Sequence, residues 1–277
     1  AKVVENFTRE NIDFIGFHGQ TIYHNPKEKI SRQLGDGKLL SQLTKRNVVY
    51  NFRENDLKNN GQGAPLTPIF HKLIVNQNKI KKPVSILNIG GISNITSLDN
   101  DNRIFSSDLG PGNCLIDKWM RINSKKNYDD KGIVAQSGTI NKIILDQALD
   151  NFYNNEVSNK RSYDIKDFDL AFVRGLSLED GAATLTEFTS QIICRKIVDK
   201  NILICGGGRK NNFLLECIRK KVKGKIELID TLNMDGDFIE SQAFAYLAIR
   251  SFLKLPISFP ETTGCKHACS GGNIVYY

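Results

Sequence analysis

The stretch Ile202–Ile229, which reads ILICGGGRKNNFLLECIRKKVKGKIELI, decides the fold class of this chain. Its first four residues are apolar and predict a buried strand, and the three glycines after them predict a turn. Asn211 is a suitable N-cap for a helix through Val222, after which Ile226–Ile229 predicts the next strand. A strand, a helix and a second strand in succession are typical of an α/β fold.

Further strands and helices are predicted on both sides of this stretch. Val84–Ile89 and Ile92–Leu98 are apolar runs around a Gly-Gly turn and predict a β-hairpin. Helices are predicted over residues 181–200 and 240–252 because apolar side chains recur there with helical spacing.

Two strands predicted near the start of the chain end in polar residues. Ile12–Phe17 leads to His18 and Gln20, and Val48–Phe52 leads to Arg53. Strand ends collect ligands in sheets of this kind, so these side chains are candidates for a binding site.

The length and composition indicate a folded protein of about two domains or of one large α/β domain. Of the 277 residues, 40% are hydrophobic and 25% are charged, which disfavours disorder. No apolar run reaches the roughly 18 to 20 residues of a membrane helix, and the N-terminus lacks the pattern of a signal peptide. The pattern changes near residue 80, so we expect an incomplete first domain over residues 1–80 and a second domain over residues 81–277.

The charge does not indicate a nucleic-acid partner. Lys and Arg number 38 against 30 Asp and Glu, a net charge of +8. The basic residues cluster only locally and lack interleaved aromatic residues, so solvated faces are favoured over a nucleic-acid surface.

The six cysteines contain no Cys-x-x-Cys pair and no disulfide framework, which favours a reducing cytoplasm. Cys265, His267 and Cys269 are spaced closely enough for a metal clip. A structural zinc takes four ligands, however, and no second cluster accompanies them. Ordinary loop thiols are therefore favoured, and no metal-binding residue is predicted.

Glycine stands beside polar residues at four predicted strand ends, where the backbone can approach a phosphate or a sugar closely. The alternative is that α/β turns need glycine in any case. None of the turns matches a P-loop or Gly-x-Gly-x-x-Gly, so a P-loop enzyme or a dinucleotide dehydrogenase is not supported. The four turns are His18–Thr21, Asn88–Gly91, Asp108–Asn113 and Gly206–Gly208.

Three ionisable residues are candidates for chemistry or binding. Asp108 follows the predicted strand Ile104–Ser107 and is placed equally well to act as a general base or to cap the next helix. Arg53 suits an anionic substrate group or a surface ion pair. Glu240 suits sugar hydroxyls or the N-terminus of its helix.

Seven segments together resemble the anhydro-N-acetylmuramic acid kinase family. They occur in that family's order and extend over nearly the whole chain, and those around His18 and Asp108 are specific. The segments are Ile15–Thr21, Asn51–Asp56, Gly61–Leu66, Asn88–Asn94, Asp108–Asn113, Gly206–Gly208 with Asn211, and Glu240–Ala245.

The resemblance implies an actin-like (ribonuclease H-like) sugar kinase fold, with two α/β domains around a cleft, in a cytoplasmic homodimer. It implies an enzyme of cell-wall recycling that uses ATP and Mg²⁺. The enzyme would open the 1,6-anhydro bridge of anhydro-N-acetylmuramic acid with water and phosphorylate O6, giving N-acetylmuramic acid 6-phosphate.

The resemblance also implies a role for each matching residue. Asp108 would be the catalytic base that deprotonates the attacking water. The sugar-binding residues would be His18, Gln20, Arg53, Asn88 and Glu240. The nucleotide-binding residues would be Gly90, Gly91, Gly110, Gly112, Gly206, Gly207, Gly208 and Asn211.

One departure leaves other functions open. Members of the family begin with a strand-turn-strand that contacts the ATP phosphates and magnesium, and nothing before residue 12 carries its pattern. We therefore expect the phosphate-binding segment to be missing from this chain. An active kinase is favoured because ionisable residues are kept at the strand ends. An inactive sugar- or nucleotide-binding remnant and a basic adaptor that kept only the fold are the alternatives.

Overall fold

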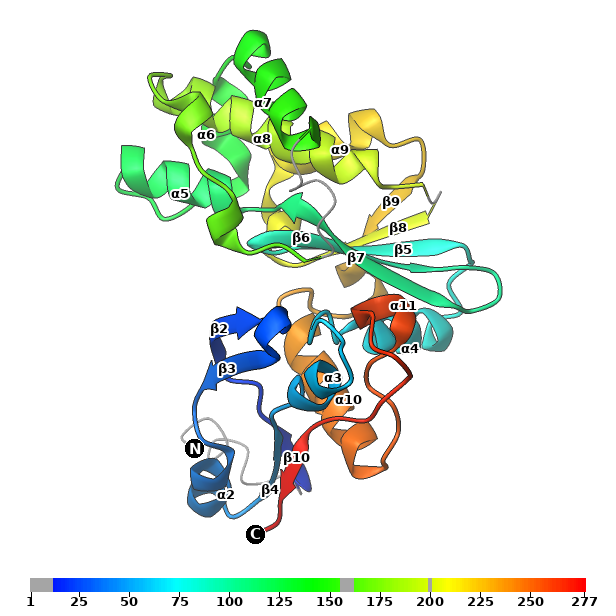
Figure 1. Cartoon of the computed structure of the whole chain (residues 1–277). Coiled ribbons are helices and arrows are strands. Elements are labelled where there is room, and N and C mark those ends of the chain that lie inside the picture. Colours follow the sequence, from blue (N-terminus) through cyan, green and yellow to red (C-terminus); the bar gives the residue numbers. More distant parts are fainter. Residues whose placement is uncertain (1–11, 155–161, 199–200) are drawn as a thin grey trace. The chain divides into compact units, whose positions relative to one another are not determined.

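The computed structural model describes residues 12–154, 162–198 and 201–277, and its mixed α/β architecture confirms the predicted fold class (Figure 1). The chain divides into two units. Unit 1 comprises the described residues up to Gln77 together with Ile104–Ser106 and Phe238–Tyr277. Unit 2 comprises the described residues of Asn78–Arg103 and Ser107–Asp237.

Unit 1 is built on a three-stranded sheet. Strand β4 lies in its centre, with β1 parallel on one side and β10 antiparallel on the other. A separate hairpin of β2 and β3, which the sequence did not predict, follows the first strand. The elements are β1 (Phe14–Gly16), β2 (Gln20–Asn25), η1 (Pro26–Glu28), β3 (Ile30–Leu34), α2 (Gly37–Thr44), β4 (Asn47–Tyr50), α3 (Glu54–Lys58), α4 (Pro68–Gln77), α10 (Ile239–Phe252), α11 (Pro260–Thr263) and β10 (Asn273–Val275).

The C-terminal segment packs in unit 1, whereas the expected division placed it in the second domain. Helix α10 contacts β1, β4 and β10, and Phe244 and Leu247 join Val49 and Phe52 in one apolar core. The chain thus returns to its first unit, which a linear change of pattern near residue 80 cannot show.

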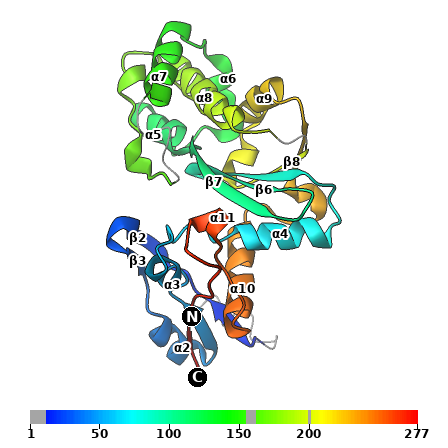
Figure 2. The same cartoon turned by 45° about the vertical axis from the view of Figure 1, so that its right-hand side comes forward.

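Unit 2 is built on a five-stranded sheet in the order β7-β6-β5-β8-β9, in which the first three residues of β7, Ile104–Ser106, are counted with unit 1. Figures 1 and 2 show helices α5 to α9 together on one face of this sheet. The elements are β5 (Val84–Ile89), β6 (Ile92–Leu98), β7 (Ile104–Pro111), α5 (Cys114–Asn123), η2 (Asp130–Gly132), α6 (Ile133–Ser137), α7 (Lys142–Asn154), η4 (Ile165–Asp167), η5 (Ala171–Val173), α8 (Leu178–Arg195), β8 (Asn201–Cys205), η6 (Gly207–Lys210), α9 (Asn212–Lys221), β9 (Lys225–Leu228) and η7 (Ile229–Leu232).

The strand-helix-strand prediction over Ile202–Ile229 is confirmed. β8 and β9 are parallel neighbours joined through α9, and the Asn211 side chain accepts a hydrogen bond from the backbone N–H of Leu214 at 2.9 Å, as an N-cap does. The predicted hairpin is confirmed too, since β5 and β6 pair antiparallel. Apolar side chains of the sheet and α9 form one core cluster, which includes Leu87, Ile89, Ile204, Leu214 and Ile218.

Strand β7 is longer than predicted. The sequence predicted a strand over Ile104–Ser107 and a turn from Asp108, but β7 continues through Asp108 to Pro111. Leu109 is fully buried, and the hydroxyl of Ser93 on β6 donates to the carbonyl oxygens of Gly110 and Pro111 at 3.1 and 3.2 Å. Pairing with β6 therefore extends the strand through a sequence that resembles a turn.

Within the described parts of the chain, no helix has both the length and the apolar character needed to span a bilayer. The expectation about the segment before residue 12 falls outside the described residues, as do the last two positions of the helix predicted over residues 181–200. The described part of that helix is α8.

Candidate active site

In unit 1, two strand ends bring His18 and Arg53 into contact. β1 and β4 are parallel neighbours, so the residues after them lie at the same edge of the sheet. Arg53 Nε donates a hydrogen bond to His18 Nε2 at 2.9 Å. The sequence placed both residues at strand ends, and the structure brings the two side chains together.

The hydrogen bonds of His18 identify its tautomer. Because Nε2 accepts from Arg53, the ring proton is on Nδ1, which donates to the carbonyl oxygen of Gly19 at 2.7 Å. The ring packs on Phe244, with the ring centroids 4.3 Å apart. Burial, and secondarily the positive charge of Arg53, lower the pKa of His18 to about 4, so the imidazole is neutral at pH 7.

Arg53 is held from several directions. Its Nη1 donates to the carbonyl oxygen of Gly63 at 2.7 Å. Burial lowers the pKa of the guanidinium, and the negative charges of Glu240 and Asp56 act in the opposite direction. Glu240 is an exposed residue in the first turn of α10. Arg53, His18 and Glu240 therefore belong to one neighbourhood of unit 1, and Gln20 lies exposed at the start of β2.

In unit 2, Asp108 is a partly buried carboxylate on β7. Its Oδ2 accepts from the backbone N–H of Tyr163 at 2.8 Å, and the Lys196 ammonium donates to its backbone carbonyl oxygen at 3.3 Å. Burial raises the pKa of Asp108 to about 6, although the hydrogen bonds from Tyr163 and Ser162 oppose the shift. The helix-cap alternative is wrong, because Asn113 is the N-cap residue of α5.

The glycine turns of unit 2 pack on one another. The backbone N–H groups of Gly112 and Asn113 donate to the carbonyl oxygens of Gly91 and Gly90, at 2.9 and 2.8 Å. A Cβ on Gly112 would collide with Gly90 O. Close backbone approach therefore requires glycine at position 112.

The Gly206–Gly208 turn lies against the end of β5. Gly206 has a φ of +80°, and a Cβ there would collide with Asn88 Oδ1. Asn88 thus lies beside the turn predicted to face the nucleotide, and its predicted role in sugar binding stays a prediction. A Cβ on Gly207, in contrast, would have Asn113 Nδ2 at 3.9 Å as its nearest neighbour.

A pocket of about 290 Å³ opens beside this turn. Three of the residues that line it, Asn113, Gly207 and Asn211, lie in or next to turns that the sequence singled out. The sequence did not identify the other lining residues as part of a site. Those missed are Ile116, Asp117, Tyr128, Asp129, Asp130, Lys131 and Lys210. Burial raises the pKa of Asp117 to about 6. Its position one helical turn after Asn113 on α5 is the signal that would have found it.

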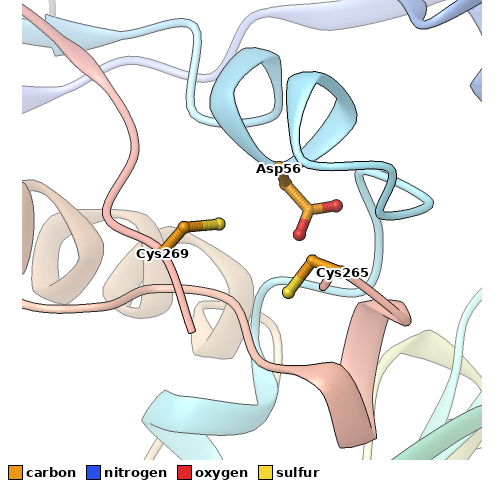
Figure 3. A group of neighbouring side chains, drawn as sticks. All are labelled: Asp56, Cys265 and Cys269. Atoms are coloured by element: carbon orange, nitrogen blue, oxygen red, sulfur yellow. The ribbon is translucent and has the colours of Figure 1, made fainter. Parts of the chain in front are cut away.

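In unit 1, the C-terminal cysteines lie beside a carboxylate. The ligand atoms of Asp56, Cys265 and Cys269 lie within 4.8 Å of one another, and Figure 3 shows the three side chains between α3 and the C-terminal segment. His267 is exposed. The structure therefore places Asp56, and not His267, beside the two thiols.

Comparison of the sequence with known proteins identifies the family of this chain. The family model for anhydro-N-acetylmuramic acid kinase matches residues 2–277. The chain belongs to the anhydro-N-acetylmuramic acid kinase family. A curated relative of that name from Pelagibacter ubique (strain HTCC1062) is 55% identical, over 96% of this chain and 74% of the relative. Another, from Zymomonas mobilis subsp. mobilis (strain ATCC 31821 / ZM4 / CP4), is 38% identical, over 99% of this chain and 78% of the relative.

Membership of the anhydro-N-acetylmuramic acid kinase family confirms the resemblance drawn from the seven segments and agrees with the actin-like sugar kinase fold that it implied. The individual roles of Asp108, Arg53, Glu240 and the glycine turns stay predictions.

Proposed function

We propose that this chain is a kinase that converts anhydro-N-acetylmuramic acid and ATP, with water, into N-acetylmuramic acid 6-phosphate and ADP. The observation that carries the proposal is the family match over residues 2–277, with relatives 55% and 38% identical. The product is one that cell-wall recycling would consume.

We assign the role of general base to Asp108. The attacking water gives a proton to the carboxylate as its oxygen bonds to C1 of the sugar. The C1–O6 bond breaks, and O6 takes the γ-phosphoryl group of ATP as ADP leaves. A base works best when its pKa lies near the working pH, and a pKa of about 6 keeps Asp108 deprotonated but still basic at neutral pH.

The sugar is proposed to bind at the strand ends of unit 1. Arg53 carries a positive charge on a planar guanidinium suited to the lactyl carboxylate, and its bonds to His18 and Gly63 fix its direction. Glu240, whose charge acts on Arg53, and Gln20, two residues after His18 in the sequence, are both exposed and suit sugar hydroxyls.

The nucleotide is proposed to bind at the glycine turns and the pocket of unit 2. Gly207 offers open backbone at the pocket wall, which is also lined by Lys210, whose ammonium is paired with Asp237. The volume is at the lower end of small-molecule sites, which suits the base and ribose of ATP.

Magnesium is proposed to reach the site on the phosphates of ATP. The cluster of metal-ligating side chains found among the described residues, Asp56 with Cys265 and Cys269, contains two thiols, whereas Mg²⁺ prefers oxygen ligands. When bound, the ion would neutralise charge on the transferring phosphoryl group. Arg53 and Asp108 are assigned no part in holding it.

We also propose that the chain works in the cytoplasm and as a homodimer. The cytoplasm is supported by the six cysteines, none of which forms a disulfide bond. The dimer rests on the family resemblance, and light scattering of the purified chain would test it.

A coupled assay of ADP release with anhydro-N-acetylmuramic acid and magnesium-ATP tests the proposed reaction, with mass spectrometry of the product. We expect turnover that requires the anhydro-sugar and gives a phosphorylated, ring-opened product. N-acetylmuramic acid, which lacks the bridge, is the control substrate. Binding of sugar or ATP without turnover would indicate the inactive remnant, and no binding would indicate the adaptor.

A further inference from the structure

Asp56, Cys265 and Cys269 form a cluster whose composition the kinase reaction does not require. All three are buried, with exposed fractions of 1%, 2% and 6%, and their ligand atoms lie within 4.8 Å of one another (Figure 3). Asp56 comes from α3 and the thiols come from the C-terminal segment, and all three belong to unit 1.

The backbone fixes the two cysteines in position. Cys269 N donates to Ser258 O at 3.1 Å and closes a loop that contains α11 and Cys265. Lys266 N donates to Asn59 O at 3.1 Å and ties this loop to the end of α3. Main-chain bonds therefore fix the backbone that carries both cysteines. Cys265 Sγ donates to the carbonyl oxygen of His267 at 3.1 Å, and Cys269 Sγ lies 3.1 Å from Ser258 Oγ.

The carboxylate is held equally firmly. Asp56 Oδ2 accepts from Gly63 N at 2.6 Å, and Oδ1 accepts from the hydroxyl of Thr263 at 2.6 Å. A Cβ on Gly61 would collide with the carboxyl group, so only glycine leaves room for it. Bonds of this kind, which orient a ligand oxygen from behind, accompany protein metal sites.

We propose that Asp56, Cys265 and Cys269 bind a zinc ion. Zinc takes thiolate sulfur at about 2.3 Å and carboxylate oxygen at about 2.0 to 2.2 Å, which places ligand atoms roughly 3.6 to 3.8 Å apart in a tetrahedron. Side-chain shifts of about an ångström would bring the three atoms to that spacing. A water molecule takes the fourth position, and two sulfur ligands disfavour Mg²⁺ and Ca²⁺.

The ion would tie the C-terminal segment to the part of unit 1 that carries Arg53. Gly63 donates its N–H to Asp56 and accepts from Arg53 Nη1 through its carbonyl oxygen, so both residues hold the same peptide. Zinc would stabilise this region without taking part in the reaction.

Zinc retention by the untagged 277-residue chain tests the site. The chain is reduced, stripped with a chelator, given zinc chloride, passed through a desalting column and analysed for metal. We expect about one zinc ion per chain, loss of zinc in Cys265→Ser and in Cys269→Ser, and retention in Cys217→Ser. Cys217 is a matched control because it is a buried cysteine of α9 in unit 2.

Two further measurements identify the ligands. Cobalt chloride should give sulfur-to-cobalt charge-transfer absorption in the wild type and in neither ligand variant, and Asp56→Asn should weaken zinc binding by more than about tenfold. Zinc should also raise the melting temperature of the wild type.

If the serine variants fail to fold, Cys265→Ala and Cys269→Ala replace them. Equal zinc retention by the wild type and the cysteine variants, or none by the reduced wild type, would overturn the site. Unchanged zinc affinity in Asp56→Asn would overturn it as well.

Discussion

Arg53, the charged residue at the strand ends of unit 1, has partners on several sides. Asp108, the charged residue on β7 of unit 2, has a pKa close enough to neutral pH for it to gain or lose a proton. Arg53 donates hydrogen bonds to His18 and Gly63, and the negative charges of Glu240 and Asp56 favour its charged form. Asp108 is buried enough for its pKa to rise to about 6. This difference agrees with the proposed roles, in which Arg53 of unit 1 would bind the substrate through a fixed charge and Asp108 of unit 2 would exchange a proton.

The largest expected effect comes from removing the proton acceptor. Asp108→Asn should lower kcat by about 10²- to 10⁴-fold, because the amide keeps the shape of the side chain but cannot accept the proton of water. Steady-state kinetics and calorimetry should show that sugar affinity is nearly unchanged. Glu187→Gln is the control, since Glu187 is a partly buried carboxylate of unit 2 paired with Lys221. A variant at position 108 that turns over normally would remove the contrast between the two units.

A substitution that keeps the charge of Arg53 tests whether its geometry matters. Arg53→Lys should weaken sugar binding by roughly tenfold or more, because an ammonium cannot reproduce the planar fork that reaches His18 and Gly63. Isothermal calorimetry measures the change, and Arg103→Lys at the surface is the control. Equal sugar affinity in both variants would mean that Arg53 acts as a point charge only.

The sequence could predict those helices and strands whose boundaries are marked by residues next to them in the chain. The β8, α9 and β9 segments are apolar runs bounded by three glycines and by Asn211, and the structure keeps them. The extension of β7 through Asp108 depends on pairing with Ser93, and the return of α10 to β1 depends on packing across most of the chain. Neither of these long-range contacts leaves a local signal.

The residues of the candidate site, too, could be predicted from the sequence only where a local signal marks them. The predicted strand ends identified His18 and Arg53 as binding-site candidates, and the structure adds their direct contact. The pocket residue Asp129 could not be predicted, because its carboxylate bonds to the backbone N–H groups of Val134 and Ala135 and so positions a loop through the start of α6. The third member of the cysteine cluster, Asp56, lies far away in sequence and was missed for the same reason.

Two neighbouring glycines separate folding from nucleotide binding in unit 2. Gly206→Ala should destabilise the fold by about 1 to 3 kcal/mol, because the residue has a positive φ and its Cβ would collide with Asn88. Gly207→Ala should change stability by less than about 0.5 kcal/mol and should weaken ATP binding. Thermal denaturation and ATP titration measure the two effects. Equal destabilisation by both would show that the Gly207 position is not open.

The stability of the wild type should depend on pH through Asp108. The folded-state pKa of about 6 lies above the ordinary value of 3.8, so burial favours the protonated form. Its stabilising contribution is complete below about pH 4 and is lost as the pH rises through about 6, by at most about 3 kcal/mol. Urea unfolding of the wild type and Asp108→Asn from pH 4 to 7 should show the variant gaining in relative stability. A constant difference would place the carboxyl in water.

The smallest effect is expected at His18, whose protonation should not contribute to the pH profile near neutrality. Its pKa is lowered from 6.5 to about 4 by burial and by Arg53, so the imidazole stays neutral from pH 5 to 8. The stability that this lowered pKa contributes is present above pH 6.5 and is lost progressively as the pH falls from about 6.5 through about 4. NMR of labelled histidine should therefore show a neutral His18 ring with the proton on Nδ1 across that range. His18→Gln keeps an acceptor for Arg53 Nε, so sugar affinity should fall less than in Arg53→Lys and should keep the same pH dependence. A His18 ring that titrates near pH 6.5 would mean that the Arg53 bond forms only part of the time, and unit 1 would then lose its fixed character.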